Sequence, residues 1–394
     1  MIRFILYAFA VLLLGDVFCW WRFFGFLRRA KVAQGWTLAF TAFMLSEAAG
    51  WTLLFFSRLW LLPGLAHMGR LALSLVYIWH LLILPSICVF LVVALLLSAL
   101  RSLLRPPPRE GDDTPSSPSL RRFLGLAGIS LAPAAGLALT GVALDEMNHF
   151  RIRRLTLRIP GMPPALDGLT IAHLSDTHVG ELTSSTVLDA LVRETNALNA
   201  DLIAFTGDLI NFDLADLPVG LRMFAALRAR HGMFLCEGNH DLILSAAVFE
   251  AAARESGLNF LFNEEATIEI AGQPVQIIGL RWTDGYGPRL KEFIEKASAL
   301  RRDDAFPIIL AHHPHAFDPA EVAGFPLVLS GHTHGGQLML TQDFGAGSFF
   351  FRYWSGLYRR GKSQLVVSNG TGNWFPLRIN APAEIIHLTL RAEI

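Results

Sequence analysis

The sequence predicts a two-part protein, an α-helical membrane region followed by an α/β layered domain. The chain of 394 residues is 53% hydrophobic with a mean hydropathy of +0.43, which is too apolar for one ordinary soluble domain. Its longest apolar runs all end before residue 145. From about Arg151 onward, short strand-like apolar runs alternate with helix-like stretches, which is typical of layered α/β proteins.

Three apolar stretches within residues 1–100 predict transmembrane helices. A helix needs about 20 mostly apolar residues to cross the hydrocarbon core of a bilayer. The stretches run approximately over residues 4–27, 36–62 and 71–100. Asp16 interrupts the first and Glu47 the second. Because charge inside a bilayer is costly, we expect each acid to face a neighbouring helix or lie near a helix end, with a functional role as the alternative.

A change of composition separates these helices from the rest of the chain. Residues 101–122 are rich in Pro, Ser, Arg and acidic residues, which predicts a linker. Residues 123–144 form a fourth apolar run that is long enough to span a bilayer. Arg121 and Arg122 precede it, so an internal segment resembling a twin-arginine export signal is the alternative. Residues 151–394 are expected to form the globular domain.

The distribution of Lys and Arg predicts the orientation, because these residues concentrate in cytoplasmic loops. The loop after the first span holds Arg28, Arg29 and Lys31, and the linker holds five arginines. The loop between the second and third spans has only Arg58 and Arg70. Four spans with this bias describe an integral plasma (inner) membrane protein whose globular domain is extracytoplasmic.

Charge and cysteine content argue against a nucleic-acid partner and against a disulfide framework. Residues 1–150 carry 12 Lys and Arg against 7 Asp and Glu, whereas residues 151–394 carry 21 against 26. An acidic globular section argues against a nucleic-acid partner, whose binding surface needs an excess of basic residues. The three cysteines have no CxxC or zinc-site spacing, so they predict no disulfide framework.

Five separate segments end strand-like runs with residues that bind divalent ions. Their carboxylate, imidazole and amide donors suit Mn, Fe or Zn. A carboxylate has two oxygens, so Asp208 is the physical choice to bridge two ions, which together can activate water for in-line attack on phosphorus. Each motif alone would be an ordinary turn or a His-rich loop, and His313 or His315 could ligate in place of His312. The segments are Asp176-Thr-His178, Gly207-Asp208, Gly238-Asn239-His240-Asp241, His312, and Gly331-His332-Thr333-His334-Gly335-Gly336-Gln337.

The ordered set DxH, GDx, GNHD, H and GHTHGGQ resembles the calcineurin-like metallophosphoesterase family over roughly residues 169–392. Residues 368–372 and 376–378 are similar to the branch that contains bacterial membrane-linked or exported phosphodiesterases. The resemblance implies a four-layer metallophosphoesterase sandwich, in which two mixed β-sheets are flanked by helices and the metals lie at one edge.

The resemblance also implies a role for each motif residue. His312 is selected because residues 310–314 resemble the family's L-x-H-x-P pattern. His240 would lie near the scissile phosphate, where it stabilises charge or protonates the leaving oxygen, and Asp241 is expected to orient its imidazole. The metal ligands would be Asp176, His178 and His334 for one ion, Asn239, His312 and His332 for the other, and Asp208 between them.

An aromatic segment bears on the class of substrate. Residues 344–358 contain Phe349, Phe350 and Trp354, which could lie in a lipid headgroup layer and admit a lipid phosphoester, with ordinary core and loop packing as the alternative. We therefore predict a two-metal phosphoester hydrolase, more specifically a phosphodiesterase, acting on a lipid-linked or nucleotide phosphoester. The alternative is a non-catalytic, metal-dependent membrane sensor, against which the presence of His240 argues.

Overall fold

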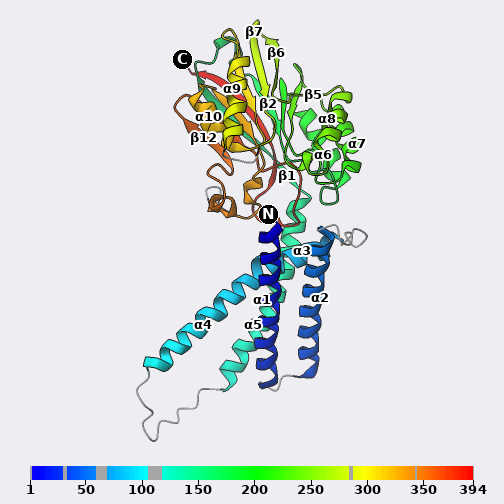
Figure 1. Cartoon of the computed structure of the whole chain (residues 1–394), viewed down its shortest axis with the longest axis vertical. Helices are drawn as coiled ribbons and strands as arrows, with labels where there is room; N and C mark the ends of the chain where they lie inside the picture. The colour runs from blue at the N-terminus through cyan, green and yellow to red at the C-terminus, as the bar shows by residue number, and fades with distance from the viewer. Residues whose placement is uncertain are drawn as a thin grey trace. The chain divides into compact units, whose positions relative to one another are not determined.

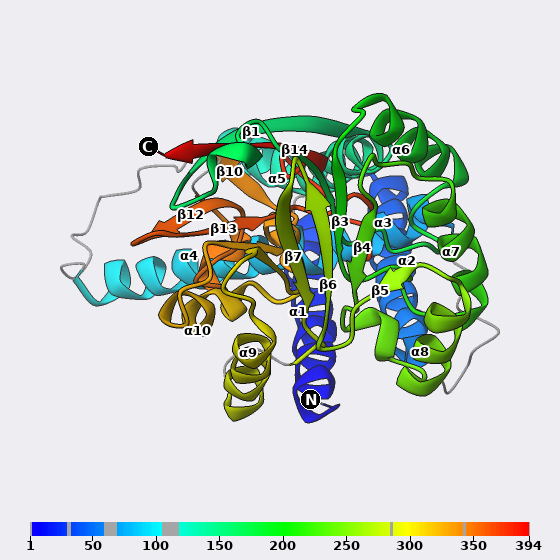
Figure 2. The same cartoon turned by 90° about the horizontal axis from the view of Figure 1, so that it is seen from above.

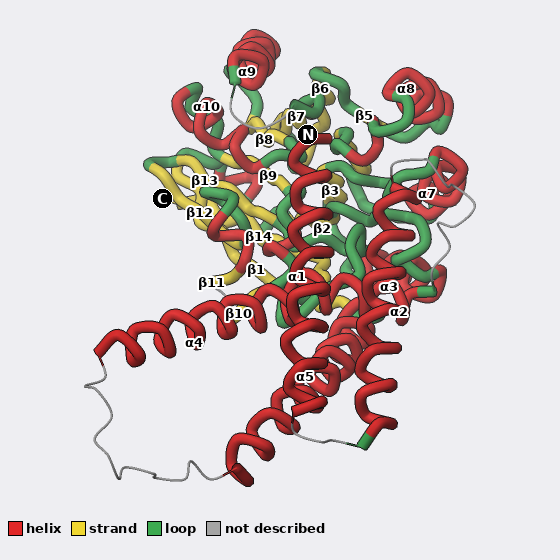
Figure 3. The backbone as a smooth tube through the Cα atoms, turned by 60° about the horizontal axis from the view of Figure 1, so that its bottom comes forward, coloured by secondary structure: helices red, strands yellow, loops and turns green. Residues whose placement is uncertain are grey.

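A computed structural model describes residues 2–29, 33–58, 69–104, 118–283, 287–341 and 344–393 (Figure 1). The chain divides into a helical unit, Met1–Leu144, and an α/β unit, Asp145–Ile394. Each unit is described by itself. Strands occur only in the second unit among the described residues, as the colouring of Figure 3 shows.

The helical unit has apolar outer surfaces and begins with two long helices, α1 and α2. Three described helical stretches, Leu6–Arg29, Gln34–Phe56 and Arg70–Leu97, are long and apolar enough to cross a membrane. Their outward-facing side chains include Leu14, Val17 and Leu96, which suits contact with lipid. The helical elements are α1 (Ile2–Arg29), α2 (Gln34–Arg58), α3 (Arg70–Ile78), the π-helical turn η2 (Trp79–Ile83), α4 (Leu84–Leu104) and α5 (Pro118–Met147).

The predicted linker over residues 101–122 falls mainly on residues 105–117, which lie outside the described residues. Helix α4 continues to Leu104 and α5 begins at Pro118, so helix extends into the predicted linker at both ends. Helix α5 contains the whole fourth apolar run, residues 123–144. Its role as a fourth span stays a prediction.

Two mixed six-stranded sheets form the centre of the α/β unit. The first has the order β1-β14-β2-β3-β4-β5, and the second has the order β12-β13-β9-β8-β7-β6. The first comprises β1 (Phe150–Pro160), β14 (Ala383–Glu393), β2 (Thr170–Leu174), β3 (Leu202–Thr206), β4 (Met233–Cys236) and β5 (Asn259–Phe260). The second comprises β12 (Gly356–Arg360), β13 (Ser363–Val367), β9 (Leu327–Ser330), β8 (Phe306–Leu310), β7 (Gln273–Gly279) and β6 (Glu264–Ile270).

The sheets and helices make four layers, which confirms the predicted fold class. Inward-facing side chains of both sheets, such as Ile171 and Ile308, share one apolar core. Leu191 and Phe249 belong to the core on the outer face of the first sheet, and Phe293 belongs to that of the second. Figure 2 shows these helices outside the two sheets. They are α6 (Ser185–Ala197), α7 (Leu217–Ala225) and α8 (Ala246–Glu255) on one side, and α9 (Pro288–Leu300) and α10 (Phe317–Val322) on the other.

Local sequence explains the central elements. Every residue of β3 is buried, as expected of a parallel strand covered on both faces. Helix α6 begins after Ser184, whose hydroxyl accepts a hydrogen bond from the backbone N–H of Val187 and caps the helix. Strands β2, β3, β4, β8 and β9 all end next to one of the polar motifs. The carboxyl ends of parallel strands are where α/β folds place their sites.

Candidate metal centre

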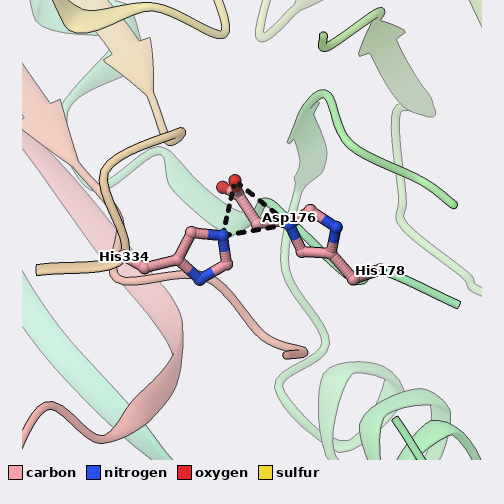
Figure 4. A group of neighbouring side chains, drawn as sticks. All are labelled: Asp176, His178 and His334. Carbon is pink, nitrogen blue, oxygen red and sulfur yellow. Dashed lines mark hydrogen bonds and ion pairs between the residues drawn. The ribbon is translucent and has the colours of Figure 1, made fainter. Parts of the chain in front are cut away.

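One group of donors is formed by Asp176, His178 and His334, all of them buried (Figure 4). The Nε2 atoms of the two histidines lie 3.0 Å apart, and Asp176 Oδ1 lies 3.1 Å from His334 Nε2 and 3.8 Å from His178 Nε2. Two imidazole nitrogens and a carboxylate oxygen that face one point fit a divalent ion. This is the set expected for the first metal.

A second group collects donors from the ends of four strands, β3, β4, β8 and β9. His312 Nε2 lies 3.2 Å from Asp208 Oδ2, and these residues with His332 could hold an ion. The side-chain oxygen of Asn239 lies 3.1 Å from His312 Nε2 and 2.9 Å from His332 Nδ1. This is the set expected for the second metal, so the chain brings every predicted ligand to one edge of the fold.

Asp208 lies between the two groups. Its Oδ2 is 3.2 Å from His312 Nε2 and 3.6 Å from His178 Nε2, which belong to different groups. A carboxylate in this position can donate to ions on both sides. The geometry therefore suits the bridging role that the sequence predicts for Asp208.

His312 is the histidine of its His-rich loop whose Nε2 faces the other donors. The Nδ1 of His312 lies 2.6 Å from the carbonyl oxygen of Thr206, which must accept, so Nδ1 carries the proton and Nε2 is free to face the donors. His313 instead uses its Nδ1 to accept the backbone N–H of His315 at 3.2 Å. Among the described residues, neither His313 nor His315 belongs to a group able to hold a metal.

The backbone at the site is strained in a way that points to function. Two glycines let the backbone pass close to the acidic side chains of the site. A Cβ on Gly238 would clash with Asp208, and one on Gly331 would clash with Asp176. Left-handed backbone is uncommon for residues other than glycine and is concentrated at functional sites. Five predicted ligands have it, namely Asp176 (φ 54°), His178 (φ 42°), Asp208 (φ 60°), His332 (φ 71°) and His334 (φ 50°).

Asp241 does not orient His240, so that part of the prediction is wrong. Its carboxylate accepts backbone N–H groups from the Asp208 loop, at 3.0 Å to Asp208 N and 2.8 Å to Leu209 N, and from its own loop, at 2.9 Å to Gly238 N. Asp241 therefore turns inward and fixes the loop that carries Asp208. It is a positioning residue for Asp208.

The ring of His240 is oriented by a backbone carbonyl. Its Nδ1 donates to the carbonyl oxygen of Asn211, which leaves Nε2 as the ring nitrogen without that bond. The ring lies 4.6 Å from that of His178 and within ligand distance of Asp208. The backbone N–H of His240 donates to Asp208 Oδ1 at 2.8 Å. The ring also lies against the partly exposed Trp374, with 5.8 Å between ring centres. His240 therefore borders both the metal donors and solvent.

Burial keeps most of the histidines neutral, which leaves lone pairs for a metal. It holds the pKa of His178 and His334 below the usual value and lowers the pKa of His332 to about 3. For His312, burial acts in the same direction, but the carboxylates of Asp208 and Asp176 outweigh it and raise the pKa to about 9. Metal binding requires neutral imidazoles and ionised carboxylates, and this donor set fits it.

Comparison with known proteins agrees with this geometry. Residues 169–336 match the family model described as calcineurin-like phosphoesterase. The chain contains a calcineurin-like phosphoesterase domain. That match covers four of the five predicted motif segments completely and ends one residue before Gln337 in the fifth.

Relatives of this phosphoesterase occur in animals and bacteria, so they do not single out a bacterial branch. A zebrafish (Danio rerio) transmembrane protein with metallophosphoesterase domain is 27% identical over 99% of this chain and 89% of its own length. The uncharacterized metallophosphoesterase YkuE of Bacillus subtilis is 29% identical over 70% of this chain and 98% of its own. An uncharacterized metallophosphoesterase of Helicobacter pylori is 31% identical over 56% of this chain, which spans 60% of that relative.

Sequence reasoning missed two side chains that border the phosphoesterase site. The ring of Trp282 lies 5.4 Å from His312 and 5.0 Å from His332, and its backbone N–H donates to Glu237 Oε1 at 3.0 Å. Arg378 is fully buried, and its Nη2 lies 3.3 Å from His334 Nδ1. Trp282 carries no sequence signal. Arg378 lies in the tail segment that resembles the family, but the resemblance assigned it no role.

The raised pKa of His312 predicts how the stability of the metal-free phosphoesterase depends on pH. A group whose pKa rises on folding, here from 6.5 to about 9, stabilises the fold below the lower value and loses that effect as pH rises through the higher one. We therefore expect the Tm of chelator-treated protein to fall between those two pH values. The His312→Gln variant should show a flatter profile in thermal unfolding. A Tm that rises over this range in the wild type contradicts the assignment.

Proposed function

We propose that this protein is a phosphoester hydrolase, more specifically a phosphodiesterase, that uses two divalent ions, Mn, Fe or Zn, at a membrane surface. The observation that carries the proposal is the position of Asp208 between two converging donor groups, with the Nε2 of His240 beside them. Paired divalent ions supply Lewis acidity and lower the pKa of bound water, which is the chemistry that phosphoester hydrolysis requires.

The residues of the site would have three roles: holding metal, positioning Asp208 and acting on the substrate. Asp176, His178 and His334 would hold one ion, Asn239, His312 and His332 would hold the other, and Asp208 would serve both. Asp241 keeps the Asp208 loop in place through its backbone contacts. His240, fixed through Nδ1 by Asn211, presents Nε2 to the substrate and stabilises charge on the phosphate or protonates the leaving oxygen.

An exposed apolar segment supports the membrane-surface setting. Leu340, Phe349 and Phe350 are 69%, 73% and 80% exposed, which is uncommon for neighbouring large apolar side chains. Asn380 ties this segment to the last turn of α5, because its side chain donates to the carbonyl of Met339 at 3.1 Å and its backbone N–H donates to Glu146 Oε1 at 2.8 Å. Large apolar side chains exposed on one segment suit contact with a lipid headgroup layer.

The same segment leads directly to the metal donors. Phe351 follows the two exposed phenylalanines, and its ring lies 5.6 Å from that of His332. A phosphoester held at a lipid surface would therefore meet the donors next to the aromatic side chains. This supports a lipid-linked substrate, with a nucleotide phosphoester as the second candidate and no nucleic-acid partner expected.

The activity is tested with the full chain in lipid nanodiscs. A chromogenic phosphodiester and the matching monoester are offered with added Mn, and again after chelation. We expect faster cleavage of the diester, lost on chelation and restored by metal. If metal-loaded protein cleaves neither these esters nor a lipid phosphodiester, the result favours the alternative of a non-catalytic membrane sensor.

The membrane-surface setting predicts a substrate-dependent effect of the aromatic side chains. Replacing Phe349 and Phe350 together with serine should reduce cleavage of a vesicle-borne phosphodiester by at least about tenfold, since even one large apolar side chain gains roughly 1.5–3 kcal/mol when fully buried. Cleavage of a water-soluble diester should stay unchanged. Val322→Ser, which alters an 83% exposed side chain on α10, is the matched control. Equal losses on both substrates would contradict the lipid-facing role.

The proposed location is an integral inner-membrane protein with the phosphoesterase domain outside the cytoplasm. The charge bias of the loops supports this orientation. A reporter that fluoresces only in the cytoplasm, fused to the C-terminus, should stay dark. A bright fusion overturns the orientation and leaves the proposed hydrolase untouched.

A further inference from the structure

The helical unit buries polar side chains in an otherwise apolar bundle. Asp16 on α1 and Glu47 on α2 are the only acidic residues within residues 1–100, and they are 3% and 5% exposed. His80, in the π-helical turn η2, is fully buried. Ionisable groups inside a membrane protein are costly and commonly mark functional sites. These three come from three different helical segments.

Asp16 is held by two consecutive residues of η2. Its Oδ1 accepts a hydrogen bond from Trp79 Nε1 at 2.9 Å, and its Oδ2 lies 2.8 Å from His80 Nε2. The wider turn of a π-helix inserts one residue into the helix, and such turns occur frequently at functional sites. Here the turn lets two neighbouring side chains reach the same carboxylate.

The hydrogen bonds of His80 determine how many protons this pair holds. Its Nδ1 lies 2.8 Å from the carbonyl oxygen of Val76, which can only accept, so Nδ1 carries a hydrogen. The remaining nitrogen, Nε2, faces Asp16 Oδ2. Without a proton between them, two lone pairs would oppose each other in an apolar interior. The pair therefore shares one proton, either as imidazolium and carboxylate or as imidazole and carboxylic acid.

Glu47 provides a second place for a proton beside this pair. Trp51, one turn later on α2, stacks on His80 with 4.7 Å between ring centres, and the charges of His80 and Asp16 reach Glu47. The Oε2 of Glu47 is buried and has no hydrogen-bond partner among the residues that the structure describes. A buried carboxylate without a partner is strongly disfavoured, whereas the protonated acid is tolerated.

Few other titratable groups face this cluster. The thiols of Cys19 and Cys88 lie 3.9 Å apart, and Cys19 is within electrostatic reach of Asp16. Residues 84–97 of α4 and 131–144 of α5 contain no Asp, Glu, Lys, Arg or His. Within the described part of the helical unit, no three His, Cys, Asp or Glu ligand atoms converge closely enough to hold a metal. The chemistry therefore fits a proton.

We propose that the helical unit contains a proton-binding site formed by Asp16, His80 and Glu47. One proton is shared by the Asp16–His80 pair, and a second is taken up as an O–H bond on Glu47 and released when that bond breaks. The site gives the membrane helices a function in addition to anchoring. The competing interpretation is a permanent interhelical contact that never exchanges its protons.

Dicyclohexylcarbodiimide tests the site, since this apolar reagent modifies carboxyl groups that are protonated in apolar surroundings. The full chain in lipid nanodiscs is treated from mildly acidic to alkaline pH, and modified residues are located by peptide mass spectrometry. We expect modification at Glu47 that decreases at least several-fold as pH rises. Glu47→Gln should abolish it, whereas Glu292→Gln, at an exposed position on α9, should leave it unchanged.

A second variant tests the shared proton. His80→Leu removes the imidazole, so Asp16 must keep the proton on its own carboxyl and should be modified to a greater extent than in the wild type, where the proton is shared with His80 Nε2. The proposal is overturned, and the permanent contact is favoured, if Glu47 is unmodified at every pH or equally modified at all of them. It is also overturned if Asp16 is modified no more in a folded His80→Leu protein than in the wild type. The pH dependence of Glu47 modification is measured on the wild-type protein by peptide mapping. It therefore tests the proposal even if a variant fails to fold.

Discussion

Asp208→Asn should lower phosphoester hydrolysis by at least about 10³-fold and reduce the amount of bound metal. Asparagine offers one oxygen and an NH2 group in place of two carboxylate oxygens, so it cannot face both donor groups. In the wild type, Asp208 Oδ2 lies 3.2 Å from His312 Nε2 and 3.6 Å from His178 Nε2. Initial rates with a chromogenic diester, together with metal analysis of the purified protein, measure both effects.

The matched control is Asp189→Asn, which removes an exposed carboxylate on α6. It should retain wild-type activity and metal content. If Asp208→Asn also retained both, Asp208 would not bridge two ions and the proposed two-metal centre would be untenable. Thermal unfolding of both variants with and without added metal distinguishes loss of metal from loss of fold.

His240→Ala should reduce turnover by about 10²–10⁴-fold while leaving the metal content nearly unchanged. The ring is fixed by the carbonyl of Asn211 and presents Nε2 at the edge of the site, where a substrate oxygen would lie. Removing a proton donor that does not ligate a metal lowers the rate and leaves the amount of bound metal unchanged. The measurement is kcat, with metal content determined on the same sample.

The control for this variant is His231→Ala, which removes an exposed imidazole outside the site. His240 also lies within ligand distance of Asp208 and His178, so a parallel loss of metal and activity would identify it as a ligand and not as the proton donor. Unchanged turnover with full metal content would favour the sensor interpretation. Each outcome therefore assigns His240 one role.

The His240 and Asp208 variants together separate the two classes of function. A metal-dependent sensor needs the donors around Asp208 but has no need of a proton donor at Nε2 of His240. An enzyme needs both. Wild-type ligand binding in the His240 variant with loss of turnover would support the hydrolase.

The sequence by itself predicted the candidate metal donors and determined the type of fold. The motifs that contain Asp176, Asp208, Asn239, His312 and His332 each follow a short strand of mostly apolar residues. That pattern is local, and parallel strand ends meet at one edge of a sheet, so the donors could be placed together before their distances were known. The lengths of the apolar runs likewise predicted three helices able to cross a membrane, because that property depends on composition and length alone.

Only the tertiary structure decided which partner each polar side chain has. Asp241 turned out to hold the Asp208 loop, and a carbonyl from residue 211 holds His240, because packing between distant segments determines which groups meet. Trp282 reaches the site from a loop whose sequence carries no motif. Asp16 and His80 are 64 residues apart and meet only when their helices pack. Hydrogen bonds between segments far apart in the chain leave no local pattern, so sequence periodicity and motif spacing could not predict them.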